Sequence, residues 1–206
     1  MATKTTSALF FGDSLMLGTA DHLGLGGIVG RIGRDLWPHA PGLRMYNLGV
    51  AGDTSTKLRA RMHDEIERRR RDNMLVVIWI GINDAAIVSG TEFVTGIRTF
   101  SKNVRECIKM VPDNAPVFVM GLHTIDEERA NVNDWGWRYL NAQLRDYSKD
   151  LQAVAKATGA TFVPVAEALG RHDLAKDGLH ITAEGYRKLF KHMQRPIRQA
   201  VDRLIA

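Results

Sequence analysis

Ser14, Asp177 and His180 are the residues whose types and spacing could carry out nucleophilic chemistry. Ser14 follows the apolar run Ala8–Phe11, at an expected strand-to-helix turn where its hydroxyl would be rigidly held and face solvent. A serine hydroxyl is a poor nucleophile by itself and needs a base. The same position suits a helix N-cap serine. Ser14 taken alone therefore leaves catalysis and capping open.

His180 is the candidate base, and it closes the segment DGLH at residues 177–180. A histidine ordinarily titrates at about pH 6.5, which suits proton relay near neutral pH. Asp177 lies three residues earlier, so in a turn its carboxylate can bind one ring nitrogen while the other faces Ser14. Such a carboxylate orients the ring without taking the proton. A loop aspartate and a capping histidine are the structural alternative.

An ester hydrolase also needs donors for the oxyanion that develops during attack. The backbone N–H of Ser14 is one candidate, and Gly52 is a second because a residue without a Cβ lets its N–H approach a ligand closely. Asn83 offers a neutral side-chain amide as a third. Simple turn formation at Gly52 and an Asx turn at Asn83 are the alternatives.

The elements that must position these residues follow from the hydrophobic pattern. Short apolar runs, two of them apolar on both faces, occur at residues 8–11, 43–48, 74–80, 117–122 and 161–165. Helical periodicity recurs between them, at residues 58–66, 93–108, 140–154 and 186–204. Thr54 and Thr182 are expected N-caps. This alternation predicts an α/β fold, a three-layer α/β/α sandwich around a five-stranded parallel sheet, in a single domain spanning residues 1–206.

The polar, glycine-bearing clusters all come after expected strands. They lie at residues 12–14, 49–54, 81–84 and 177–180. Ligands of open parallel sheets collect beyond the carboxyl ends of the strands. We therefore expect the four clusters to converge on one edge of the sheet.

In combination, these clusters resemble the four sequence blocks of the SGNH (GDSL) hydrolase family. GDSL at residues 12–15, NLGVAGDT at 47–54, GIND at 81–84 and DGLH at 177–180 occur in the order of that family. The resemblance covers nearly the whole chain. It implies a flavodoxin-like sheet of five parallel strands and hydrolysis of ester bonds without a metal or organic cofactor.

The resemblance also implies the residue roles. Ser14 would be the nucleophile, His180 the base and Asp177 its orienting partner, with Ser14, Gly52 and Asn83 as the oxyanion hole. Among their neighbours, Asp13 and Asp84 are expected to hold the loops, and residues 53–54 to cap the following helix.

The substrate is less well defined by the sequence. The loop at residues 123–137 follows the fourth expected strand, and four of its side chains could line a pocket: His123, Ile125, Trp135 and Trp137. The tryptophans could equally pack beneath their own helix. Because no lid domain fits in 206 residues, we expect an open site for short or compact acyl groups. Thioesterase, lysophospholipase, carbohydrate deacetylase and acyltransferase activities stay open.

Two other classes of function fit some of these residues. A metal-dependent phosphohydrolase would use Asp13, Asp84, Asp177 and His180 as ligands, but would leave the serine, glycine and asparagine without a joint task. A flavin-binding module would need a phosphate-cradling loop after the first strand, and GDSLMLGT has little serine or threonine for it.

Composition restricts the partners and the compartment. The net charge is +5, but acidic residues interleave with the basic clusters at residues 68–71 and 187–203, so we expect solvated helix faces and no nucleic acid partner. The single cysteine, Cys107, is expected in the core. The apolar run at residues 74–80 is too short to span a bilayer. With no signal peptide recognised, we expect a cytoplasmic enzyme of undetermined oligomeric state whose partner is a small ester substrate.

Overall fold

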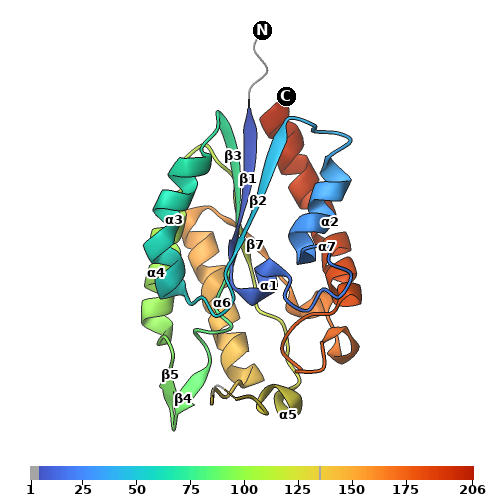
Figure 1. Cartoon of the computed structure of the whole chain (residues 1–206). Helices are drawn as coiled ribbons and strands as arrows, with labels where there is room; N and C mark the ends of the chain where they lie inside the picture. The colour runs from blue at the N-terminus through green and yellow to red at the C-terminus, as the bar shows by residue number, and fades with distance from the viewer. Residues whose placement is uncertain (1–4, 135) are drawn as a thin grey trace.

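A parallel sheet of five strands forms the centre of the computed structural model, which describes residues 5–134 and 136–206 (Figure 1). The strands run in the order β2-β1-β3-β6-β7, with bounds β1 Thr6–Gly12, β2 Leu43–Gly49, β3 Asn73–Trp79, β6 Val117–Met120 and β7 Thr161–Val163. Numbered among themselves, they have the 2-1-3-4-5 order of flavodoxin-like folds. The predicted five-stranded parallel sheet is confirmed.

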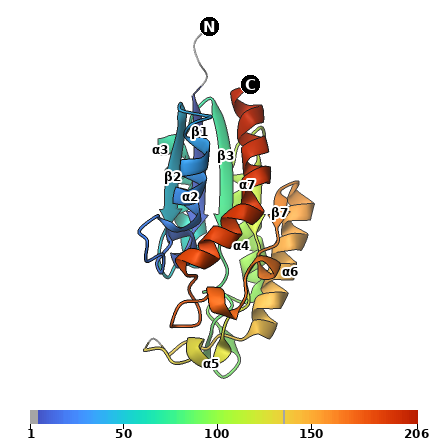
Figure 2. The ribbon, with the colours of Figure 1, turned by 90° about the vertical axis from the view of Figure 1, so that its right-hand side faces the viewer.

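Helices cover both faces of this sheet (Figures 1 and 2). One layer contains α3 (Ser55–Arg69), α4 (Ile97–Lys109) and α6 (Asn141–Thr158). The other contains α2 (Gly27–Leu36) and α7 (Ala183–Ile205). The interior strand β1 is buried along its whole length because both of its faces are covered. The predicted three-layer arrangement is confirmed.

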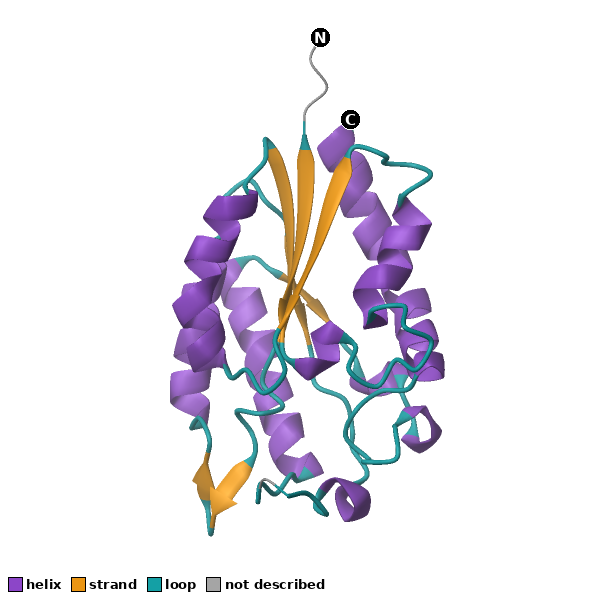
Figure 3. Ribbon diagram, viewed as in Figure 1, coloured by secondary structure: helices purple, strands orange, loops and turns teal. Residues whose placement is uncertain are grey.

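Several short elements surround the carboxyl ends of the strands, in the lower half of Figure 3. They are α1 (Ser14–Leu17), β4 (Ile87–Ser89), β5 (Glu92–Phe93), α5 (Glu127–Ala130), η1 (Ala166–Ala168) and η2 (Arg171–Asp173). Phe93, which the periodicity assigned to a helix, lies in the β4–β5 hairpin, and α4 begins four residues later. Ile87 in this hairpin exchanges two backbone hydrogen bonds, at 2.8 and 2.9 Å, with Arg138 of a later loop. The hairpin therefore braces that loop.

Sequence periodicity did not reveal α2. Three of its ten residues are glycine, namely Gly27, Gly30 and Gly33, and glycine costs about 1 kcal/mol relative to alanine inside a helix. Burial of Ile28 and Ile32 on the inner side of the helix compensates for this weak propensity. Tertiary packing stabilises this helix.

The expected caps and core positions are found. Thr54 accepts a hydrogen bond from the Lys57 N–H, and Thr182 accepts one from the Gly185 N–H. Cys107 is buried, and burial raises the pKa of its thiol to about 12. None of the helices in the described part of the chain has the length and apolarity needed to cross a bilayer.

Candidate active site

Ser14, His180 and Asp177 form a hydrogen-bonded row at the carboxyl edge of the sheet. The Ser14 Oγ lies 2.8 Å from His180 Nε2, and His180 Nδ1 lies 2.6 Å from Asp177 Oδ2. The other carboxylate oxygen, Asp177 Oδ1, accepts the backbone N–H groups of Leu179 and His180, both at 3.0 Å. The backbone of the DGLH turn thus orients the Asp177 carboxylate, and this carboxylate orients the His180 ring.

The charge on Asp177 follows from these contacts. Burial by itself would raise the pKa of this carboxyl, but the hydrogen bonds from the His180 ring and from the two backbone N–H groups outweigh it and hold the pKa well below its usual range. Asp177 is therefore a carboxylate at neutral pH. It accepts the Nδ1–H, so Nε2 of the neutral ring offers its lone pair to the Ser14 hydroxyl.

The hydroxyl of Ser14 is not used for helix capping. Asp13 is the N-cap of α1, and its Oδ1 accepts the Leu15 N–H at 2.9 Å, which makes Ser14 the first residue of the helix. Asp13 is 1% exposed, and burial raises its pKa to about 7. Its Oδ2 has no hydrogen-bond partner among the described residues. The capping role considered for Ser14 thus belongs to Asp13.

Gly52 and Asn83 lie beside Ser14 and His180 in one pocket. Gly52 has a φ of +76°, a backbone conformation that favours glycine. One N–H of the Asn83 amide donates to the Asp53 carbonyl at 2.9 Å. This bond fixes the orientation of the amide and leaves its second N–H for a ligand, which is the preorganisation that an oxyanion hole needs.

Asp84 ties the Asn83 turn to the start of α3. Its two carboxylate oxygens accept the Ser55 N–H at 2.9 and 3.0 Å, and Oδ1 also accepts the Ser55 hydroxyl at 2.6 Å. Burial raises the pKa of Asp84, and the hydrogen bonds from Ser55 oppose that rise. The position of Asp84 suits the loop-holding role expected of it.

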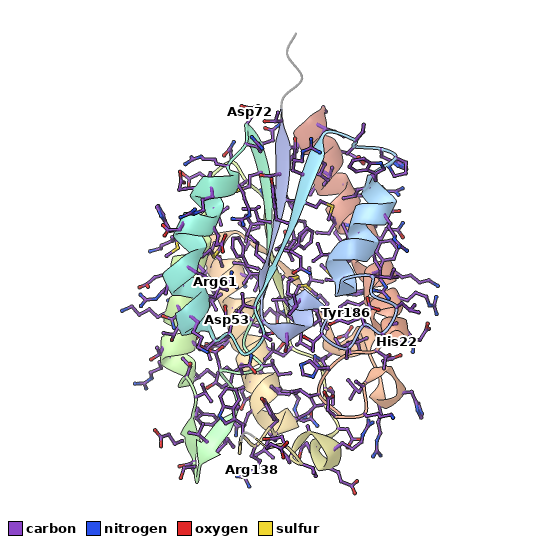
Figure 4. All side chains as sticks on the ribbon, in the orientation of Figure 1. His22, Asp53, Arg61, Asp72, Arg138 and Tyr186 are labelled. Atoms are coloured by element: carbon purple, nitrogen blue, oxygen red, sulfur yellow. The ribbon has the colours of Figure 1, made fainter. Side chains whose placement is uncertain are left out.

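Arg61 of α3 is a supporting residue that the sequence did not reveal. Its guanidinium donates to the Asp53 carboxylate at 2.8 Å, to the Leu48 carbonyl at 2.7 Å and to the Gly12 carbonyl at 3.2 Å (Figure 4). One side chain thus fastens the ends of β1 and β2 just before the Ser14 and Gly52 loops. It also explains why Thr54 alone caps α3, since Asp53 binds Arg61. No local pattern separates such an arginine from a solvent-facing one.

The pocket beside Ser14 has a volume of about 290 Å³. It is lined by Ser14, Gly52, Asn83 and His180 and, in addition, by Thr19, Ala51, Trp137, Tyr139 and Leu179. Trp137 was expected there, whereas the other four were not. Two asparagines hold this wall: Asn131 exchanges two hydrogen bonds with the Tyr139 backbone, at 2.7 and 3.1 Å, and Asn133 binds Trp137 in the same way at 2.7 and 3.2 Å.

Two of the expected lining residues lie elsewhere. His123 and Ile125 are 1% and 4% exposed and do not line this pocket. Ile125 exchanges backbone hydrogen bonds with the Asn141 side chain, and His123 packs behind the DGLH turn. The expectation that they face substrate is corrected, because the loop folds inward before it reaches the pocket. Trp135 lies outside the described residues.

The carboxylates of the metal-site alternative are engaged with protein donors. Asp13, Asp84 and Asp177 each accept backbone N–H groups. Within residues 5–134 and 136–206, no group of three or more histidine, cysteine, aspartate or glutamate side chains is placed to hold a metal ion.

Solved structures with the same fold include two named esterases or lipases. A lipase/acylhydrolase from Enterococcus faecalis superposes with a TM-score of 0.77 at 23% identity, covering 95% of this chain and 96% of that chain. The acetylxylan esterase Axe2 from Geobacillus stearothermophilus superposes with a TM-score of 0.73 at 21% identity, covering 96% of each chain. A comparison with curated proteins found no match.

The family model of the GDSL-like Lipase/Acylhydrolase family matches residues 10–188, which is most of the chain. The match begins within β1 and ends within α7, so it includes every residue of the hydrogen-bonded row. The protein therefore belongs to the GDSL-like Lipase/Acylhydrolase family and is a serine hydrolase that acts on ester bonds.

Proposed function

We propose that this protein is a carboxylesterase for esters of short or compact acyl groups and that it works through an acyl-enzyme on Ser14. The observation that carries the proposal is the row of hydrogen bonds from Ser14 Oγ to His180 Nε2 at 2.8 Å and from His180 Nδ1 to Asp177 at 2.6 Å. A serine hydroxyl in contact with an oriented neutral imidazole is the arrangement that activates a serine nucleophile.

The reaction follows from this arrangement. Ser14 Oγ attacks the ester carbonyl carbon while His180 Nε2 takes the hydroxyl proton. The oxyanion is stabilised by the N–H groups of Ser14 and Gly52 and by the free N–H of Asn83. His180 then gives the proton to the departing alcohol, which leaves an acyl-Ser14 ester. Water then attacks this ester while His180 takes its proton, and His180 returns that proton to Ser14 Oγ as the carboxylic acid leaves.

The size of the pocket supports a short acyl group. Its volume of about 290 Å³ is at the lower limit of pockets that enclose a drug-sized ligand, about 300–1,000 Å³. Trp137, Tyr139 and Leu179 provide apolar wall beside Ser14. Thioesters, lysophospholipids and acetylated sugars present the same acyl carbonyl and are alternative substrates. Axe2 is described as an acetyl-xylooligosaccharide esterase, which adds acetylated xylo-oligosaccharides to these candidates.

The test compares the wild-type protein with Ser14→Ala on a matched panel of substrates. Nitrophenyl acetate, butyrate, octanoate and dodecanoate, an acetyl thioester and acetylated xylo-oligosaccharides are assayed for kcat/KM. We expect a maximum at acetate or butyrate and loss of all activities in Ser14→Ala. A maximum at dodecanoate would overturn the short-acyl assignment, and an active Ser14→Ala would overturn the assignment of the nucleophile.

A second assay separates this proposal from the metal-dependent alternative. We expect full esterase activity in excess chelator and rapid inactivation by a fluorophosphonate that labels Ser14. Loss of activity in chelator, regained with a divalent cation, would instead favour the phosphohydrolase reading.

A further inference from the structure

His123 lies directly behind the catalytic turn, three residues beyond the end of β6. Its Nε2 is 2.8 Å from the carbonyl oxygen of Leu179, the residue that precedes His180. Because a carbonyl can only accept a hydrogen bond, Nε2 carries the proton and donates it. A single side chain thus binds the backbone next to the proposed base.

The ring of His123 is held in one protonation state and one orientation. It is 1% exposed, and burial lowers its pKa to about 4, so it is neutral at neutral pH. Its Nδ1 has no hydrogen-bond partner among the described residues. The ring packs edge-on against Trp79, with centroids 6.4 Å apart and planes at 69°. The Leu179 carbonyl is therefore its one polar anchor in the described part of the chain.

Two further contacts from the same segment hold the rest of the turn. The Asp126 N–H donates to the Gly178 carbonyl at 2.9 Å, and Arg129 donates to the Ala175 carbonyl at 3.0 Å. Gly178 has a φ of +70°, and a Cβ there would come within 2.8 Å of the Asp126 carbonyl oxygen. The segment after β6 thus supports residues 175–180 along their length, and His123 makes the contact nearest to His180.

We propose that His123 is a positioning residue that holds the Leu179 carbonyl and thereby keeps the His180 ring within hydrogen-bond distance of Ser14. The inference rests on the proposed function, since it assigns His180 the role of base. In this role His123 does not contact the substrate, since it does not line the pocket beside Ser14. A displacement of about 1 Å in a catalytic group can cost about 100-fold in rate, so loss of the anchor is expected to act on turnover more than on substrate binding.

The test uses three substitutions at this position. His123→Phe keeps a ring but removes the donor, His123→Gln keeps an N–H donor at the reach of Nε2, and His123→Asn keeps an amide that is too short to reach. His192→Phe, at an exposed position of α7, is the matched control. Each variant is assayed for kcat and KM on nitrophenyl acetate, for the rate of fluorophosphonate labelling, and for the downfield proton resonance of the His180–Asp177 hydrogen bond. Thermal unfolding reports on the fold.

We expect His123→Phe and His123→Asn to lower kcat and the labelling rate by about 100-fold, with little change in KM and a weakened or broadened downfield resonance. We expect His123→Gln and His192→Phe to behave like the wild type. If His123→Phe does not fold, the comparison of His123→Gln with His123→Asn decides. Equal kcat and an equal resonance in those two variants would overturn the inference.

Failure of the proposed function is a separate result. A wild-type protein that hydrolyses no ester and resists the fluorophosphonate would refute the esterase proposal. The dependence of the downfield resonance on His123 would still test the positioning role, because that signal requires only the His180–Asp177 hydrogen bond.

Discussion

Asp177 and Asp13, two carboxyl groups of the candidate site, differ in pKa because their surroundings differ. Asp177 accepts hydrogen bonds from the His180 ring and two backbone N–H groups, which lower its pKa. Asp13 has a single N–H donor, from Leu15, against full burial, which raises its pKa to about 7. One aspartate can therefore stabilise an imidazolium, while the other caps a helix and is only partly ionised at neutral pH. This division of tasks between like groups is typical of acid-base sites.

The Ser14–His180 pair is expected to act as a unit. Ser14→Ala and His180→Ala should each lower kcat by about 10⁴–10⁶-fold, and the double variant should be scarcely worse, since either loss removes the activated nucleophile. Steady-state kinetics on nitrophenyl acetate measures this. Multiplicative losses in the double variant would mean that the two residues act independently.

Asn83 is expected to act on the transition state. Asn83→Ala should lower kcat by about 10²–10³-fold with a small change in KM, because the amide donates to an oxyanion that the bound ester does not yet carry. Asn114→Ala is the matched control, since Asn114 is exposed and lies before β6, at the opposite edge of the sheet. A rise in KM at constant kcat would place Asn83 in substrate binding instead.

At the scale of elements, the sequence predicted those helices, strands and caps that depend on interactions between neighbouring residues. The five strands and the caps at Thr54 and Thr182 were predicted correctly, because periodicity and capping chemistry are written in neighbouring residues. The glycine-rich α2 and the contacts of Arg61 were missed, because only the folded chain brings their partners together. No short window of sequence contains both Arg61 and the Gly12 carbonyl that it binds.

The candidate site shows the same division. The sequence blocks identified Ser14, Gly52, Asn83 and the DGLH turn, which the structure places together. The sequence offered four side chains of the loop after β6 as possible pocket lining: His123, Ile125, Trp135 and Trp137. The loop first runs inward at His123, and only its later part, at Trp137 and Tyr139, returns to the pocket. Knowing that a residue belongs to a loop does not show whether its side chain faces the pocket or the protein interior.

Asn131 and Asn133 hold the part of the pocket wall that contains Trp137 and Tyr139. We expect this wall to determine which acyl-chain lengths the enzyme accepts. Asn131→Ala removes two hydrogen bonds to the Tyr139 backbone, which should loosen the wall and lower stability by about 1–3 kcal/mol. The preference for acetate over octanoate, measured as a ratio of kcat/KM values, should fall. Asn131→Asp, which keeps the acceptor of the shorter bond, is the control and should retain more of the preference. An unchanged ratio in Asn131→Ala would remove this loop from chain-length selection.

At the scale of the whole molecule, buried titratable groups make stability depend on pH in opposite senses. The pKa of His123 is about 4 in the folded protein, against about 6.5 when unfolded. The unfolded chain therefore binds more protons in that interval, and stability is lost as pH falls through it. The lowered pKa of Asp177 acts in the same direction at lower pH.

Asp13 acts in the other direction. Its pKa is about 7 in the folded protein, against about 3.9 when unfolded. The native state binds more protons in this window, so the contribution of Asp13 to stability is complete below about pH 4 and is lost as pH rises to about 7, by up to about 4 kcal/mol. At neutral and alkaline pH the wild-type protein thus carries the cost of a buried carboxylate.

Asp13→Asn removes this dependence while keeping an N-cap, because asparagine caps helices about as well as aspartate. The free energy of unfolding of the variant minus that of the wild type should be larger at pH 8 than at pH 5. The value of this difference at pH 5 does not affect the prediction. Denaturant unfolding of both proteins at the two pH values measures the change. Asp113→Asn, at an exposed position before β6, should show no such gain. A difference between wild type and Asp13→Asn that is the same at both pH values would mean that Asp13 is already ionised at pH 5, and that its burial is compensated by groups other than the Leu15 N–H.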